Sequence, residues 1–184
     1  SIQFEDKIKY KQIQDLITVV GTQSNYGRIR NSLPSNGNGR WFSSQEDDSG
    51  ANIVVLGYGI ANKLFPHQSP LGKTVSLGSK NLKVIGVVDK KGGSLGGPDF
   101  DNYCYMPLEL AFESKGNRDI QSFFIQAKSG SDVGYVKSTA EKTLLNKYDK
   151  DNFSVFDQSQ ILSTITGILG TLTAGLTGIA AISL

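Results

Sequence analysis

The feature that most constrains this chain is a long uncharged stretch at its C-terminal end. All 19 basic and 17 acidic side chains lie within residues 1–157, and residues 158–184 carry none. A content of 38% hydrophobic and 20% charged residues describes an ordinary soluble domain only as an average over the whole chain. The average therefore combines two different segments.

The uncharged segment has the length and pattern of a membrane-entering helix. Residues 161–184 contain no charge and no proline, and as a helix they would be about 36 Å long, against about 30 Å for a bilayer core. Aliphatic residues recur at spacings of three and four, and small residues lie four apart behind them. The alternative is an amphipathic helix packed on a soluble core, because five threonines and four glycines lower the helix propensity. The small residues that we expect to pack against another helix are Gly167, Gly170, Ala174 and Gly178.

The first 157 residues suffice for one domain or for two small lobes. A net charge of +2 spread along the chain does not indicate nucleic-acid binding, which requires a concentrated basic face. Cys104 has no second cysteine with which to form an internal disulfide, and His67 is the only histidine, so a Cys/His metal site is not expected. The chain begins at Ser1 with no signal segment, and we interpret it as a piece of a longer protein.

Short apolar runs separated by turn residues predict a mainly β middle segment followed by an α/β end. Lys7, Lys9 and Lys11 alternate as on a solvated strand face, and the Ser/Pro/Asn/Gly-rich stretch 32–40 is a candidate boundary between lobes. The predicted strands are 16–20, 26–29, 53–56, 74–77, 82–88, 102–106, 120–127 and 153–156. The predicted helices are 60–65, a short one after Pro107, and one whose apolar face contains Val133, Val136, Ala140, Leu144 and Tyr148.

Three motifs suggest catalysis or nucleotide binding, but their surroundings do not fit. The stretch Gly57–Asn62 resembles a dinucleotide-binding turn, yet its helix is stopped by Pro66. Gly72-Lys73-Thr74 resembles the end of a phosphate-binding loop, but a strand follows where a helix is needed. Gly92–Gly96 matches G-x-S-x-G, but Gly96-Gly97-Pro98 cannot open the required helix. The acidic groups at 46–48 and 99–101 do not continue into a calcium loop. We therefore predict no catalytic residue, no cofactor and no metal site.

Several short segments, taken in order, resemble the extracytoplasmic domain of ABC transporter permeases of the MacB/FtsX type, most closely the branch that exports macrolides and antimicrobial peptides. They are Gly39-Arg40-Trp41-Phe42-Ser43 followed by acids, 54–57, Leu64-Phe65, Pro70-Leu71-Gly72-Lys73, 84–88 with Gly86 and Val87, and 105–108 with Pro107. Residues 179–184 resemble the second transmembrane helix of such permeases. Trp41 stands where phenylalanine is common in the family.

The resemblance implies an α+β, two-lobed extracytoplasmic domain. A porter-like βαβ lobe would comprise residues 1–33 and 119–157, with an inserted, mainly β lobe at 34–118 and a transmembrane or stalk helix starting at 158–184. The first half of the porter-like lobe and the preceding transmembrane helix are not in this chain, so that lobe is expected to be incomplete.

The resemblance also implies a non-catalytic role on the outer side of the cell membrane. The domain would act as a homodimer, with a cytoplasmic ATPase and an extracytoplasmic adaptor, to couple ATP hydrolysis to the export of antimicrobial peptides, macrolides or related compounds. One alternative is an FtsX-like signalling or tethering module that regulates a cell-wall hydrolase or senses peptides. Another is a soluble binding domain with a buried C-terminal helix.

Overall fold

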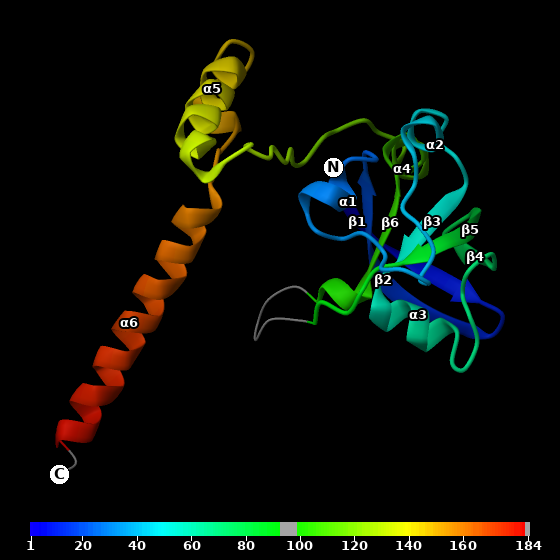
Figure 1. Cartoon of the computed structure of the whole chain (residues 1–184), viewed down its shortest axis with the longest axis horizontal. Helices are drawn as coiled ribbons and strands as arrows, with labels where there is room; N and C mark the ends of the chain where they lie inside the picture. The colour runs from blue at the N-terminus through cyan, green and yellow to red at the C-terminus, as the bar shows by residue number, and fades with distance from the viewer. Residues whose placement is uncertain (93–98, 183–184) are drawn as a thin grey trace. The chain divides into compact units, whose positions relative to one another are not determined.

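The computed structural model describes residues 1–92 and 99–182. By its internal contacts the chain forms two units, Ser1–Ile125 and Gln126–Leu184. In the first unit the strands close into a barrel in the order β1-β2-β6-β3-β5-β4 (Figure 1). The strands are β1 (Ile2–Tyr10), β2 (Ile13–Thr22), β3 (Ile53–Leu56), β4 (Thr74–Leu77), β5 (Lys80–Val87) and β6 (Tyr103–Pro107).

Two antiparallel hairpins and two parallel pairs build the barrel. The hairpins are β1–β2 and β4–β5, whereas β2 pairs with β6, and β3 with β5, in parallel. The antiparallel pairs β3–β6 and β1–β4 complete the ring. On β1, Ile2 and Ile8 are buried while Lys7 and Lys9 are exposed, as the alternation of charges along this strand predicts.

The barrel interior is the main hydrophobic core. Two helices contribute side chains to it: α3 (Tyr58–Leu64) and α4 (Leu108–Lys115). Helix α4 lies so close to β2 that a Cβ atom on Gly21 would be 2.1 Å from the Cβ of Ala111, so this contact requires a glycine. The fully buried residues of this core include Ile2, Ile8, Val19, Val54, Leu56, Ile60, Leu64, Leu82, Met106 and Leu110.

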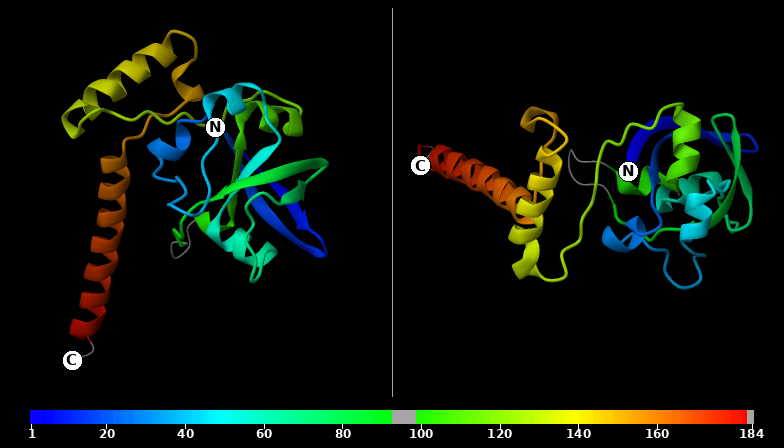
Figure 2. Two further views of the ribbon diagram at one scale, coloured as in Figure 1. Left: turned by 45° about the vertical axis from the view of Figure 1, so that its right-hand side comes forward. Right: turned by 90° about the horizontal axis from the view of Figure 1, so that it is seen from above.

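A second, smaller core lies on the outer face of the same sheet. Neighbouring strand residues point to opposite faces, so Val19 and Cys104 belong to the inner core while Val20 and Tyr105 belong to the outer one. Helix α1 (Tyr26–Ile29) contributes Tyr26 to this core, and a later segment contributes Phe42, with Trp41 packed against the cluster. Helix α2 (Ser44–Asp48) follows that segment; in Figure 2, α1 is blue and α2 is cyan. The buried members are Val20, Tyr26, Phe42, Ile53, Val55, Val88 and Tyr105.

The second unit contains helices α5 (Val133–Leu145) and α6 (Gln158–Ile182) and no strand among its described residues. Helix α5 buries none of its side chains, and Tyr135 and Tyr148 are exposed. The described side chains of α6, residues 163–177, are all exposed. Within the described part of the chain, no helix combines the length and apolar character needed to cross a membrane. Single 3-10 turns occupy 100–102, 130–132 and 150–152.

Most predicted elements are confirmed. Strands β3 and β4 have the predicted bounds, and β2, β5, β6, α3, α4 and α5 overlap their predictions. Three predicted strands are wrong. Residues 26–29 form helix α1, where Tyr26 and Gly27 are buried beneath Trp41. Residues 120–127 and 153–156 are not strands, because no strand of the described chain pairs with either of them.

The division of the chain also differs from the expected lobes at 1–33 and 34–118. Strand β2 forms five consecutive residue pairs with β6, from Thr18–Tyr103 to Thr22–Pro107, so residues 1–33 share one barrel with residues 34–118. The second unit begins at Gln126 instead of 119, because residues 121 and 122 bond to the backbone of Ser1. The chain as a whole is a mixed α/β structure.

Candidate functional site

Strand β5 brings together motif residues that are far apart in the sequence. Gly39, with φ of +85°, forms an isolated bridge with Gly86, and the Arg40 amide donates to the Ile85 carbonyl oxygen at 3.0 Å. A Cβ atom on Gly39 would lie 2.3 Å from that oxygen, and one on Gly86 would lie 2.4 Å from the Arg40 carbonyl oxygen. Each glycine therefore permits the backbone of the other segment to approach.

The segment from Pro70 to Lys73 is attached to the same strand. The Lys73 amide closes a turn on the Pro70 carbonyl at 3.1 Å, and the Gly72 amide donates to the Val84 carbonyl at 2.8 Å. Gly72 takes φ of +75°, which suits glycine. The side chain of Leu71 lies 2.7 Å from where a Gly39 Cβ would be, so the two motif segments meet.

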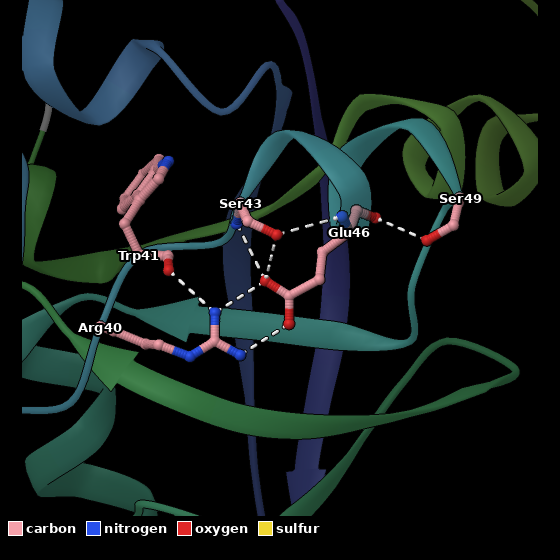
Figure 3. A network of polar contacts seen from close by, with 5 residues as sticks. All are labelled: Arg40, Trp41, Ser43, Glu46 and Ser49. Carbon is pink, nitrogen blue, oxygen red and sulfur yellow. Dashed lines mark hydrogen bonds and ion pairs between the residues drawn. The ribbon is translucent and has the colours of Figure 1, made fainter.

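Arg40 holds helix α2 through a network that Figure 3 shows. Its guanidinium donates to both carboxylate oxygens of Glu46, at 2.7 and 2.6 Å, and to the Trp41 carbonyl at 3.1 Å. Glu46 also forms a capping box with Ser43. The bond from Arg40, assisted by those from Ser43, lowers the pKa of Glu46 to about 2. The guanidinium thereby connects the 39–43 segment to the helix that follows it.

Asp47 is a structural residue that the sequence analysis missed. The residue is buried, at 6% exposure, and its carboxylate accepts hydrogen bonds from the backbone amides of Ser24 at 2.9 Å and Leu108 at 3.1 Å. Burial raises its pKa despite these two bonds. It ties α2 to the segment after β2 and to the start of α4. The signal that could have revealed α2 is the S-x-x-E spacing of Ser43 and Glu46.

The remaining motif residues belong to the core or to helix ends. Phe42 is buried in the outer core beside Trp41, with ring centroids 4.8 Å apart. Leu64 and Phe65 lie in the inner core, Val87 is buried where β5 ends, and Pro107 precedes α4. These residues are not brought to the Gly39–Gly86 contact, with the exception of Val87, whose amide donates to the Asn38 carbonyl at 2.9 Å.

The proposed packing residues of the C-terminal helix lie on α6. Gly167, Gly170 and Ala174 are exposed, and neither glycine has a neighbouring heavy atom where a Cβ would be. Gly178 is within the bounds of α6, but its side-chain position lies outside the described residues.

The discounted motifs occupy ordinary structural positions. Gly57 precedes α3, and a Cβ there would lie 2.5 Å from the carbonyl oxygens of Asp101 and Tyr103, so it allows close contact with β6. Gly72-Lys73-Thr74 leads into strand β4. The core of the G-x-S-x-G match, residues 93–96, lies outside the described residues.

The described residues form no group of three or more His, Cys, Asp or Glu side chains able to hold a metal ion. Cys104 is fully buried in β6, and this burial raises the pKa of its thiol. A cavity of about 70 Å³ lies between helix α1, strand β6 and the segment that follows β5. Its lining residues are Tyr26, Arg30, Ser32, Lys91, Phe100 and Tyr105. The motif residues Gly39, Gly86 and those of the 70–73 turn hold backbone segments together.

Comparison with known proteins gives a consistent result. The sequence model of the family described as MacB-like periplasmic core domain matches residues 2–143. The macrolide export ATP-binding/permease protein MacB of Marinobacter nauticus is 32% identical over 147 residues, which are 79% of this chain and 23% of that protein. An uncharacterized ABC transporter permease of Methanocaldococcus jannaschii is 28% identical over 147 residues, which are 79% of this chain and 35% of that protein. The chain thus spans about a quarter to a third of the length of these relatives.

Two solved structures share the fold. The extracellular domain of the noncanonic ABC-type transporter YknZ from Gram-positive bacteria superposes with a TM-score of 0.61 at 25% identity, covering 73% of this chain and 66% of that one. The periplasmic region of MacB from Actinobacillus actinomycetemcomitans gives a TM-score of 0.68 at 20% identity, covering 89% of this chain and 72% of that one.

Proposed function

The chain belongs to the family of MacB-like periplasmic core domains, and from this membership we propose that it is the extracytoplasmic domain of an ABC transporter permease. The proposed domain is non-catalytic and lies on the outer side of the cell membrane. It acts as a homodimer together with a cytoplasmic ATPase and an extracytoplasmic adaptor. In this assembly it couples ATP hydrolysis by the ATPase to the export of antimicrobial peptides, macrolides or related compounds. The observation that carries the proposal is the family match over residues 2–143.

The contacts among the motif residues around Gly39 and Gly86 support a mechanical role. Gly39, Gly86 and the 70–73 turn hold three segments of the barrel together by backbone contacts, and the Arg40–Glu46 pair fixes the helix that follows. Such contacts make a unit that moves as one body, because packed cores resist continuous deformation. A unit of this kind suits the transmission of motion better than the binding of a cofactor.

Helix α6 is the proposed transmitting element. Its 25 residues would extend about 37 Å as a continuous helix. It carries an exposed aliphatic stripe that includes Ile165, Leu169, Leu172 and Leu176, next to the rows of small residues. We propose that α6 is a stalk that continues into a membrane helix, and that Gly167, Gly170, Ala174 and Gly178 form its packing face.

The test is a double substitution, Gly170→Leu with Gly178→Leu, in the full-length permease reconstituted with its ATPase. Leucine has the higher helix propensity, so helix α6 itself is not weakened. We expect loss of export and of coupled ATPase stimulation, with unchanged unfolding of the barrel unit, because the bulkier side chains keep the packing faces apart.

The matched control is Gly170→Ala with Gly178→Ala, which changes the same two positions but keeps a small side chain at each. We expect this control to retain export. Wild-type export by the leucine double variant, or equal loss in both double variants, would contradict the assignment of the packing face.

A further inference from the structure

A small cavity beside the outer core is lined by two cations and three hydroxyl groups. The cations are Arg30, at the end of α1, and Lys91, on the segment after β5. The hydroxyls belong to Tyr26, Ser32 and Tyr105, which are buried at 8%, 3% and 2% exposure. The ring of Phe100 forms an apolar part of the wall.

The polar groups around the cavity are held in place by one another. The Lys91 ammonium donates to the Arg30 carbonyl oxygen at 3.0 Å and to Ser32 Oγ at 2.6 Å. The Ser32 hydroxyl in turn donates to the Arg30 carbonyl oxygen at 3.2 Å. The Arg30 guanidinium lies 4.8 Å from the centre of the Phe124 ring. The ammonium thus keeps one N–H, and the guanidinium several, for a further acceptor.

No carboxylate neutralises these two cations within residues 1–92 and 99–182. Every described lysine and arginine ion pair lies elsewhere, and residues 93–98 contain no acid. Asp101 contacts the same segment, but its two oxygens accept from the backbone amides of Lys91 and Gly92. Burial, and then the charge of Arg30, lower the pKa of Lys91. The charged amine is therefore unfavourable here until an anion joins it.

We propose that this cavity binds a phosphate group, held by Arg30 and Lys91 and by the hydroxyls of Tyr26 and Tyr105. The donors lie on three parts of the chain: helix α1 and its end, the segment that follows β5, and strand β6. They therefore approach the cavity from several directions. That arrangement suits a tetrahedral oxyanion better than a planar carboxylate. A cavity of about 70 Å³ has room for about five water-sized atoms, the number of heavy atoms in a phosphate. Arg and Lys are the usual partners of phosphate oxygens in proteins.

The experiment is a titration of the 184-residue chain with inorganic phosphate, followed by amide NMR shifts at constant ionic strength. We expect saturable shifts at Arg30, Ser32 and Gly92 in the millimolar range or below. Lys91→Gln and Arg30→Gln should each weaken the affinity roughly tenfold, because each removes a charge-assisted hydrogen bond. Tyr105→Phe removes only a hydroxyl and should weaken it less.

The matched controls are the neighbouring cations. Lys90 faces the ring of Tyr58, 6.0 Å away, and Arg28 does not line the cavity, so Lys90→Gln and Arg28→Gln should leave the affinity within about twofold. Equal weakening by the controls, or shifts that never saturate, would overturn the site. Binding of acetate as tight as phosphate would overturn the assignment to phosphate.

A second titration, with glycerol phosphate, distinguishes the two possible sources of the phosphate group, which are a phosphate monoester and the free ion. Tighter binding than inorganic phosphate would indicate a phosphate monoester, and weaker binding would indicate the free ion; either result supports the cavity as a phosphate site. The proposed transport role does not depend on this outcome, because no residue of the cavity belongs to the Gly39–Gly86 contact or to α6.

Discussion

At the scale of single residues, the family motifs are explained by contacts that a sequence pattern does not reveal. Gly39 and Gly86 were selected only by resemblance, and the structure shows that each faces the backbone of the other segment. Asp47 was not selected at all, because an acid among other acids gives no sign of burial. Its role depends on two amides, those of Ser24 and Leu108, that lie 23 and 61 positions away.

The charge on Glu46 should stabilise the fold in a defined pH window. Its pKa is lowered from 4.5 to about 2 in the folded state, chiefly by Arg40, so the stabilisation is present above about pH 4.5 and is lost as the pH falls toward 2. Glu46→Gln keeps an acceptor for the capping box and removes the charge. We expect a loss of about 1 kcal/mol at pH 7, after allowance for solvent screening.

Urea unfolding of both proteins at pH 7 and pH 3 measures this effect, and the difference between them should narrow at pH 3. Glu113→Gln is the control, since it breaks an ion pair with Lys80 on the surface and should change stability little. A difference that is constant with pH would show that the pair contributes through its shape alone.

The glycine at position 39 should be much less replaceable than the one at position 37. Both have a positive φ, +85° and +90°, but only Gly39 has backbone atoms where a Cβ would stand. Gly37→Ala should cost about 1–2 kcal/mol from its backbone conformation alone. Gly39→Ala should cost at least about 3 kcal/mol because the 39–86 contact must also open. Thermal unfolding of the two variants measures the difference, and equal losses would rule out a role for the contact.

At the scale of elements, local pattern predicted five of the six barrel strands, all except β1. The four-residue strands β3 and β4 have the predicted bounds, because short β-branched runs between turn residues are strong signals. Residues 120–127 have the same kind of pattern, yet they form no strand, since strand structure depends on a partner that the pattern does not contain. The predicted strand at 26–29 is wrong: these residues form helix α1, and the two buried ones pack against Trp41, which lies outside the local pattern.

Strand β6 provides a test of the barrel through its single cysteine. Cys104 is fully buried with a raised thiol pKa, so we expect almost no reaction with a thiol reagent in the native chain at pH 8. Labelling should accelerate with urea along the same transition as the loss of circular dichroism. Lys83→Cys in a Cys104→Ala background places the thiol on an exposed position of β5 and should react at once. Rapid labelling of native Cys104 would mean that the barrel opens locally at β6.

At the scale of the whole molecule, the two units differ in how they are stabilised. The barrel unit has an inner and an outer core, whereas helix α5 of the second unit buries no side chain. The uncharged segment in the sequence predicted that the chain is not uniform, but it did not predict where the units divide. That division depends on pairing between β2 and β6, which no local window contains.

A fragment of residues 1–125 should therefore fold alone. We expect it to unfold cooperatively in urea with a midpoint close to that of the whole chain, because both cores lie within it. A fragment of residues 126–184 should show no cooperative transition, since it lacks a core of its own among its described residues. Failure of the 1–125 fragment to fold would show that the barrel needs the second unit.

The parallel pairing of β2 with β6 determines when the barrel can form during synthesis. Val20 pairs with Tyr105, so the ends of this contact are 85 positions apart in the chain. The N-terminal hairpin can form early, but it cannot gain its parallel neighbour until β6 has emerged. Contacts of such long sequence separation make folding slow, because the loop-closure entropy must be overcome first. Barrel closure is thus a late event, and the apolar faces of β1 and β2 remain exposed to solvent until it occurs.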